Sequence, residues 1–261
     1  MGKKLVLYDK IYNITSEKKR NDLIFRYKKY LNNLIKGFPK SSVSINKLRN
    51  YDKRFEIYIS GPEEIFISNL FKKEIGVVIE FKDVHVGDVY KGTMVEVGKV
   101  GFGIFVDCAI LNTSVDVLLN LNTLRRQLCK DKKLSLREII KVYDFIDHFP
   151  IYMKITEVDK QNNKLLGEIA EKTLILFKKI SHENIEALFM SGETKGQFKK
   201  ALIQKGHLRD IISVKRYGFL EHIVLLKQSC EAPGIISKIG RNLTNCKLSA
   251  LRSVKIKNVF E

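Results

Sequence analysis

The sequence contains no tryptophan and, among its 261 residues, only four cysteines and four prolines. The cysteines are widely spaced and form no C-x-x-C pair; they are Cys108, Cys129, Cys230 and Cys246. Because the ligands of structural zinc sites cluster in sequence, this spacing disfavours a metal centre. Reduced, mostly buried thiols are the expected state, which is typical of a cytoplasmic protein.

Long apolar segments are also missing. No uninterrupted apolar run approaches the roughly 18 residues that a membrane-spanning helix needs. The N-terminus, residues 1–9, is basic, but its apolar stretch is far too short for a signal peptide. The hydrophobic fraction of 44% is ordinary for a globular protein. We therefore expect a soluble cytoplasmic chain with no membrane partner.

Common catalytic motifs are absent as well. The patterns G-x-x-x-x-G-K-[ST], H-E-x-x-H and G-x-S-x-G do not occur. Asp144, Asp147 and His148 lie together near the end of an expected helix, where an ordinary polar helix face is the simpler interpretation. We expect a non-catalytic protein with no cofactor and no metal. An RNA-processing enzyme would need a carboxylate or histidine cluster assembled from distant residues.

Basic residues are what the chain has in excess. It carries 47 Lys and Arg against 29 Asp and Glu, a net charge of +18. This charge favours a polyanionic partner, nucleic acid first and an anionic membrane surface second. A compositional bias of an AT-rich genome toward Lys, Ile and Asn is the alternative explanation. Residues 1–82 and 173–261 each carry +9, whereas residues 83–172 are neutral. Within that neutral stretch, residues 121–141 carry +5, so the remainder carries −5.

Residues 1–82 follow strand and helix periodicities in the order βαββαβ, which predicts a ferredoxin-like domain. The predicted strands lie at 5–12, 43–49, 54–60 and 76–81. The first predicted helix is capped by Thr15 or Ser16 and runs to Lys36, and the second begins at Pro62.

Residues 83–172 have short alternating strands with glycine bends, which predict a small closed barrel. Three motifs in this stretch resemble those of the S1-type RNA-binding OB domain. They are Val86-Gly87-Asp88 with Gly92-Thr93, then Phe102-Gly103-Ile104-Phe105-Val106-Asp107, and finally Val158-Asp159. The whole chain also resembles an uncharacterised archaeal family that has such a domain in its middle.

The S1 resemblance implies that Phe102 and Phe105 contact RNA bases, with Lys99 as a basic contact beside them. An aromatic ring stacks on any base and needs no particular sequence. The alternative is that one or both rings fill the barrel core, because simple alternation places them on opposite faces unless a glycine bend intervenes. The third strand departs from the S1 pattern, since Asp116 stands where glycine is usual and no histidine is present.

An insertion at residues 121–148 delays the next strand of the barrel. The capping-box pattern of Ser135 and Glu138 predicts a helix from Leu136 to about Phe145. A basic helical insertion at this place is loosely similar to the S1-type domain of translation initiation factor two alpha subunit. The candidate RNA contacts here are Arg125, Arg126, Lys132, Lys133 and Arg137.

Residues 173–261 predict a small basic α+β domain. The expected elements are helices at 180–190, 197–204 and 232–239, a hairpin of strands at 210–216 and 219–226, and a final strand at 247–257. Candidate RNA contacts are Lys199, Lys200, Lys205, Lys215 and Arg216.

The predicted architecture is therefore α+β, with domains at 1–82, 83–172 and 173–261. The leading hypothesis is a non-catalytic RNA-binding protein whose partner is ribosomal or other structured RNA, in translation or ribosome function. Ribosomal proteins are further candidate partners. The alternative is a protein-interaction and nucleic-acid-binding factor of RNA polymerase or of the RNA-processing machinery. RNA affinity rests largely on the neutralisation of phosphates by basic residues. We therefore expect the main RNA contacts in the N-terminal and C-terminal domains and in the insertion.

Overall fold

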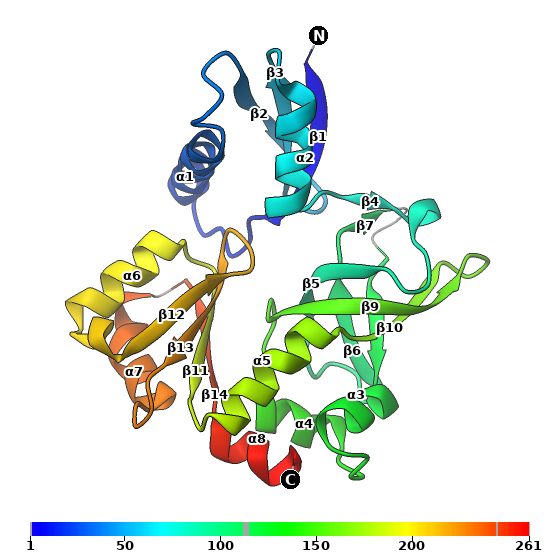
Figure 1. Cartoon of the computed structure of the whole chain (residues 1–261), viewed down its shortest axis with the longest axis vertical. Helices are drawn as coiled ribbons and strands as arrows, with labels where there is room; N and C mark the ends of the chain where they lie inside the picture. Colours follow the sequence, from blue (N-terminus) through cyan, green and yellow to red (C-terminus); the bar gives the residue numbers. More distant parts are fainter. Residues whose placement is uncertain (1, 112–114, 244, 261) are drawn as a thin grey trace. The chain divides into compact units, whose positions relative to one another are not determined.

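The computed structural model describes residues 2–111, 115–243 and 245–260 (Figure 1). The chain forms two compact units, Met1–Val78 and Ile79–Glu261. Within the described residues, none of the helices combines the length and apolar character that crossing a membrane requires.

The first unit is a three-stranded antiparallel sheet of order β1-β3-β2 with two helices. Its elements are β1 (Lys3–Lys10), α1 (Glu17–Leu34), β2 (Ser42–Leu48), β3 (Arg54–Ser60) and α2 (Glu64–Glu74). The Ser16 hydroxyl caps α1 by accepting a hydrogen bond from the Lys19 N–H at 3.2 Å. The buried face of α1 includes Tyr27, whose ring stacks on Phe55 of β3 at 3.8 Å between centroids.

The predicted fourth strand at 76–81 does not join this sheet as a strand. Beside β1 there is a single bridge, Leu7 to Val77, with flanking hydrogen bonds at Gly76 and Val78. The chain then forms β4 (Ile79–Glu80), which pairs in parallel with β7 (Ile110–Leu111) of the second unit's own sequence. Residues 76–78 thus hydrogen-bond to β1, whereas Ile79 and Glu80 pair with β7. The first unit therefore has three strands, where the sequence predicts four.

The second unit begins with a closed barrel of order β10-β8-β6-β5-β9. Its strands are β5 (Val89–Val95), β6 (Gly103–Asp107), β8 (Val117–Asn120), β9 (Pro150–Asp159) and β10 (Lys164–Ile169). The β8–β10 pair is parallel and the other pairs are antiparallel. This five-stranded arrangement fits an OB-like fold, as the glycine-punctuated strand pattern predicts.

The insertion between β8 and β9 forms two short helices, α3 (Leu121–Leu128) and α4 (Leu136–Tyr143). Ser135 and Glu138 form the predicted capping box at the start of α4. Leu124 and Leu128 of α3 and Ile139 of α4 are fully buried in the same core as the barrel interior. The insertion is therefore part of the barrel's packing rather than a separate basic arm.

A four-stranded antiparallel sheet of order β12-β13-β11-β14 follows the barrel. Its strands are β11 (Ala187–Ser191), β12 (Ile211–Arg216), β13 (Glu221–Leu226) and β14 (Lys247–Leu251). The associated helices are α5 (Glu171–His182), α6 (Lys195–Gln204), α7 (Ala232–Ile239) and α8 (Ser253–Phe260). Single 3-10 turns occur as η1 (Phe81–Asp83), η2 (His207–Asp210) and η3 (Gly240–Asn242).

Two predictions for this region are wrong. Residues 187–191 form a central strand rather than the end of a helix at 180–190; the strand is buried on both faces, and a short apolar run of this kind has no distinguishing period. The predicted final strand at 247–257 ends at Leu251, and α8 begins at Ser253. The predicted hairpin and the helix at 232–239 are confirmed.

The sheet has a different hydrophobic cluster on each face. One face packs beneath α6 and α7, while the other joins the barrel interior in one continuous core (Figure 1). Phe149 of the barrel and Phe189 of β11 meet there with ring centroids 4.8 Å apart. The division at residue 172 into two separate domains stays a prediction, because the two parts share this core within one compact unit.

Candidate nucleic-acid interface

Phe102 and Phe105 lie on the same side of the barrel. Their ring centroids are 6.1 Å apart with planes perpendicular, and Phe102 is 55% exposed. Phe102 stands in a bend just before β6, so strict strand alternation does not govern its direction. Both rings line a pocket of about 650 Å³ formed by β6, β8 and the β9–β10 hairpin. Neither aromatic fills the barrel interior.

Gly103 makes this arrangement possible. A Cβ on Gly103 would lie 2.5 Å from the Leu119 carbonyl oxygen and 3.0 Å from the Asn120 Cα, so only glycine lets β6 approach β8 this closely. Next to it, the Phe102 carbonyl accepts a hydrogen bond from the Leu121 N–H at 2.8 Å. The backbone that follows the Phe102 side chain is thereby fixed to β8 and the start of α3.

The pocket's charged lining is mixed. Glu96 and Asp116 contribute carboxylates, and Lys164 contributes an ammonium group. The predicted contact Lys99 is not among the lining residues; its ammonium group pairs with Glu96 at 2.6 Å in the adjoining turn. This surface therefore offers exposed aromatic area, and its charged lining residues carry a net charge of −1. Lys164, Leu118 and Leu166 line it without having been singled out from the sequence, since strand residues of this kind carry no distinguishing motif.

The basic residues of the insertion are partly engaged within the protein. The Arg125 Nε donates to the Leu134 carbonyl at 2.7 Å, and the Arg126 guanidinium pairs with Glu168 at 2.9 Å. Lys132 reaches the Asn258 carbonyl at 3.3 Å. Lys133 and Arg137 are exposed. The predicted group of five is thus divided between structural roles and exposed positions.

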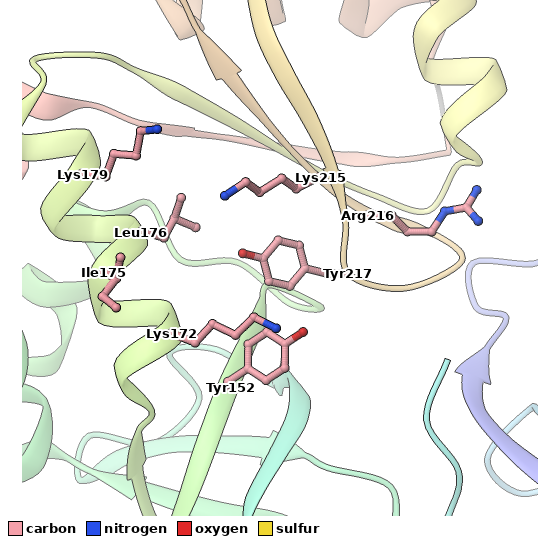
Figure 2. Close-up of a pocket in the computed structure, with 8 residues that line it drawn as sticks. All are labelled: Tyr152, Lys172, Ile175, Leu176, Lys179, Lys215, Arg216 and Tyr217. Atoms are coloured by element: carbon pink, nitrogen blue, oxygen red, sulfur yellow. The ribbon is translucent and has the colours of Figure 1, made fainter. Parts of the chain in front are cut away.

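The C-terminal candidates separate into two groups. Lys199 and Lys200 are exposed on α6, and Lys205 is exposed at its C-terminal cap. Lys215 and Arg216 end β12 and line a different pocket of about 480 Å³, shown in Figure 2. The other residues around that pocket come from β9, α5 and the β12–β13 turn; they are Tyr152, Lys172, Ile175, Leu176, Lys179 and Tyr217.

The elements around this second pocket are joined by hydrogen bonds. The Tyr152 N–H donates to the Thr173 hydroxyl, and the Tyr152 carbonyl accepts from the Ala170 N–H, both at 2.8 Å. These bonds fix β9 against the start of α5. Tyr217 packs on the hydrophobic core, with its ring centroid 6.0 Å from that of Tyr152. Only the seven-residue spacing of Lys172 and Lys179 on one helix face could have indicated this set from sequence.

The two carboxylates noted near the end of the insertion helix, Asp144 and Asp147, have structural partners. The Asp144 carboxylate accepts the Ala250 N–H at 2.7 Å, and the Asp147 carboxylate accepts the Val97 N–H at 2.9 Å. Burial alone would raise the pKa of Asp147, but the hydrogen bonds from Lys247 and Val97 hold it below its usual value. Among the described residues, there is no group of three or more His, Cys, Asp or Glu side chains arranged to hold a metal ion.

His222 is fully buried on the α6 and α7 side of the sheet. Burial, together with the positive charges of Arg216 and Lys195, lowers its pKa to about 3. The histidine is therefore neutral at physiological pH. Because adjacent strand residues point to opposite faces, Glu221 lies on the other side of the sheet from His222, so the two cannot act as an acid–base pair.

Comparison with known proteins identifies two adjoining family domains. Residues 84–181 match the DUF2110 central domain, and residues 185–251 match the DUF2110 C-terminal domain. No curated protein sequence matches the chain.

Two solved structures are similar to parts of the chain. One is the uncharacterized protein MJ1198 from Methanocaldococcus jannaschii, with 21% identity over 34% of this chain and 96% of that one, and a TM-score of 0.23. The other belongs to the a/eIF2alpha-aDim2p-rRNA complex from Pyrococcus horikoshii, with 9% identity over 49% of this chain and 70% of that one, and a TM-score of 0.26. The two domain matches together cover 165 of the 261 residues of the chain. The chain therefore belongs to the DUF2110 family.

Proposed function

We propose that this protein is a non-catalytic RNA-binding protein whose barrel is an S1-type domain. The observation that carries the proposal is the pair Phe102 and Phe105, which line one pocket on the barrel surface. Phe102 is 55% exposed beside a second ring, so the pair presents aromatic surface to a ligand. Unpaired RNA bases are a matching ligand, because every base offers a flat π-face to an aromatic ring.

The proposed partner is ribosomal or another structured RNA in the cytoplasm, bound through its unpaired loops. Single-stranded segments suit this surface because its pocket holds apolar side chains among few charges. The net charge of +18 supplies the general attraction to a polyanion. The three-stranded first unit, with the Leu7–Val77 bridge at its edge, is proposed to be a reduced ferredoxin-like domain.

A second candidate function is supported by the carboxylates of the same pocket. Glu96 and Asp116 lie where phosphates would be repelled, so this face could instead receive a basic or apolar segment of a protein partner. In that case the protein would be an interaction factor of RNA polymerase or of the RNA-processing machinery. Co-purification from native extract separates the two functions: ribosomal components support the first, and polymerase or processing subunits support the second.

The direct test is fluorescence anisotropy with a labelled single-stranded RNA and the full chain. Loss of one stacked base costs about 1–3 kcal/mol, so Phe102→Ala is expected to weaken binding roughly 5- to 150-fold. Phe25→Ala is the matched control, because Phe25 is an exposed phenylalanine (68%) on α1 of the other unit. Equal RNA affinity of the Phe102→Ala variant and the unchanged chain would refute base stacking at the barrel.

A further inference from the structure

The barrel pocket has carboxylates at its rim, so a second surface must hold the RNA backbone if the protein binds RNA with useful affinity. Phosphate neutralisation supplies a large share of the affinity of such complexes. The pocket between α5, β9 and the end of β12 has the complementary composition: three lysines and an arginine, and no carboxylate among its described lining residues. The pocket around Phe102 and Phe105, in contrast, has two carboxylates and one lysine among its lining residues.

Figure 2 shows how the side chains of this second pocket are directed. Lys172 extends over the ring of Tyr152, with its ammonium group 4.1 Å from the ring centroid. Lys215 reaches from β12 toward α5, whereas the Arg216 side chain is directed to the other side of its strand. Lys172 and Lys215 thus line one pocket from different elements, and Arg216 adds positive charge at the edge.

These lysines are available to a ligand. Within the described part of the chain, neither Lys172 nor Lys215 forms an ion pair. Lys179 is less free, because its ammonium group lies 3.7 Å from Glu183. The cation–π contact with Tyr152 holds Lys172 in place without cancelling its charge, which reduces the ordering cost of binding an anion.

The pocket also has apolar and hydroxyl surface. Ile175 is 55% exposed on α5, and Tyr217 faces it across the pocket in Figure 2. Burial raises the pKa of Tyr217 to about 12, so its hydroxyl stays a neutral hydrogen-bond donor. A ligand with a phosphate, a ribose and a base meets cations, a donor and an apolar wall here, whereas inorganic phosphate would use only the cations.

The two pockets lie at different places on the second unit. Tyr152 stands near the start of β9, and Val158 near its end pairs with Leu165 of the barrel pocket. Six residue steps along β9 lead from Tyr152 to Val158, or about 20 Å at ~3.3 Å per step. Substitutions in one pocket should therefore leave the other unchanged, because sites farther apart than about 7–10 Å are usually independent.

We infer that this lysine–tyrosine pocket is a backbone-binding site for single-stranded RNA, in which Lys172 and Lys215 contact phosphates. Ile175 and Tyr217, on opposite sides of the pocket, pack against the attached nucleoside. The inference rests on the proposed function and adds a site to it. It places the electrostatic contact at the junction between the barrel and the C-terminal sheet, separate from the base-stacking surface.

The test measures RNA affinity of the full chain as a function of salt between about 50 and 200 mM. A labelled single strand of about 12 nucleotides lies within the length that an OB fold binds. Each phosphate contact to a single strand contributes about 0.7 to the slope of log affinity against log salt, so K172Q/K215Q should reduce the slope by about 1.4. K172R/K215R should retain most of the slope, because the positive charges remain.

The matched control is K178Q/K238Q, which removes two exposed lysines from α5 and α7 that do not line the pocket. An equal loss of slope in this control would overturn the inference, because general charge would then explain the effect. Phe102→Ala should lower the affinity with an unchanged slope.

Two outcomes distinguish this site from the proposed function. The first outcome is that the unchanged chain binds RNA and K172Q/K215Q keeps the same affinity and the same salt slope. This outcome would overturn the inference about the pocket and leave the proposed function standing. Absence of RNA binding by the unchanged chain at low salt would overturn both. Binding to phosphatidylserine vesicles that needs these two lysines, without a matching effect on RNA, would also overturn the inference. Thermal denaturation of each variant checks that the exposed substitutions leave the fold intact.

Discussion

The Lys247 ammonium group lies 2.8 Å from the Asp147 carboxylate and joins β14 to the loop that leads from α4 into β9. The other oxygen of the same carboxylate accepts the Val97 N–H at 2.9 Å. One side chain therefore connects the final strand of the C-terminal sheet, the insertion and the turn after β5.

Replacing the two partners of this ion pair should have unequal effects. Lys247→Ala removes a partly exposed ion pair and should cost at most about 1 kcal/mol. Asp147→Ala also leaves the Val97 N–H without its acceptor and should cost about 1–3 kcal/mol. Urea denaturation of the two variants measures the difference. Equal losses would mean that the Val97 hydrogen bond contributes nothing to stability.

A methyl group at Gly103 should disturb the barrel face. Gly103→Ala places a Cβ within 2.5 Å of the Leu119 carbonyl oxygen, and relieving this overlap should cost about 1–3 kcal/mol. Because Phe102 adjoins Gly103, RNA affinity should fall as well. The matched control is Gly101→Ala, where the added Cβ meets nothing within 4 Å and stability should change by less than about 0.5 kcal/mol. Similar midpoints for both variants in denaturant would contradict the close β6–β8 approach.

Acid should destabilise the protein through His222. Its folded pKa of about 3 lies below the ordinary value of 6.5, so the folded state resists a proton that the unfolded chain binds. The stabilisation is complete above pH 6.5 and is lost as the pH falls toward 3, at about 1.4 kcal/mol per pH unit. Lowering the pH from 7 to about 5 should therefore remove about 2 kcal/mol.

The contribution of His222 is isolated by comparison with His222→Leu. The free energy of unfolding of the leucine variant should fall less steeply between pH 7 and 5. Parallel pH profiles of the two chains would show that another group governs the acid response.

Sequence patterns predicted the elements whose signals are local. The Ser135 capping box, the hairpin after residue 210 and the helix at 232–239 each depend on neighbouring residues, and the structure confirms them. The misses depend on distant partners. Strand β11 is buried on both faces, and α8 follows a strand that ends where the sheet ends. Neither boundary is visible in a short window of sequence.

The two candidate sites also differ in whether a local sequence signal predicts them. A motif of six residues brought Phe102 and Phe105 to attention, and their rings do share one pocket. The lysine–tyrosine pocket has no comparable motif, because Tyr152, Lys172 and Lys215 come from three elements that only folding brings together. The basic hairpin predicted Lys215, Tyr152 has no signal in the sequence, and the one signal for Lys172 is its seven-residue spacing from Lys179.

The contact between Phe149 and Phe189 also limits how the gene can be divided. A fragment ending at residue 181, where the central family match stops, would keep Phe149 and Phe177 but lose the strand that covers them. The aromatic surface that β11 covers in the full chain would then be exposed to solvent and would favour self-association. Truncations made to isolate one activity should therefore retain residues 79–261 together, since a failed fragment would report on solubility rather than on RNA.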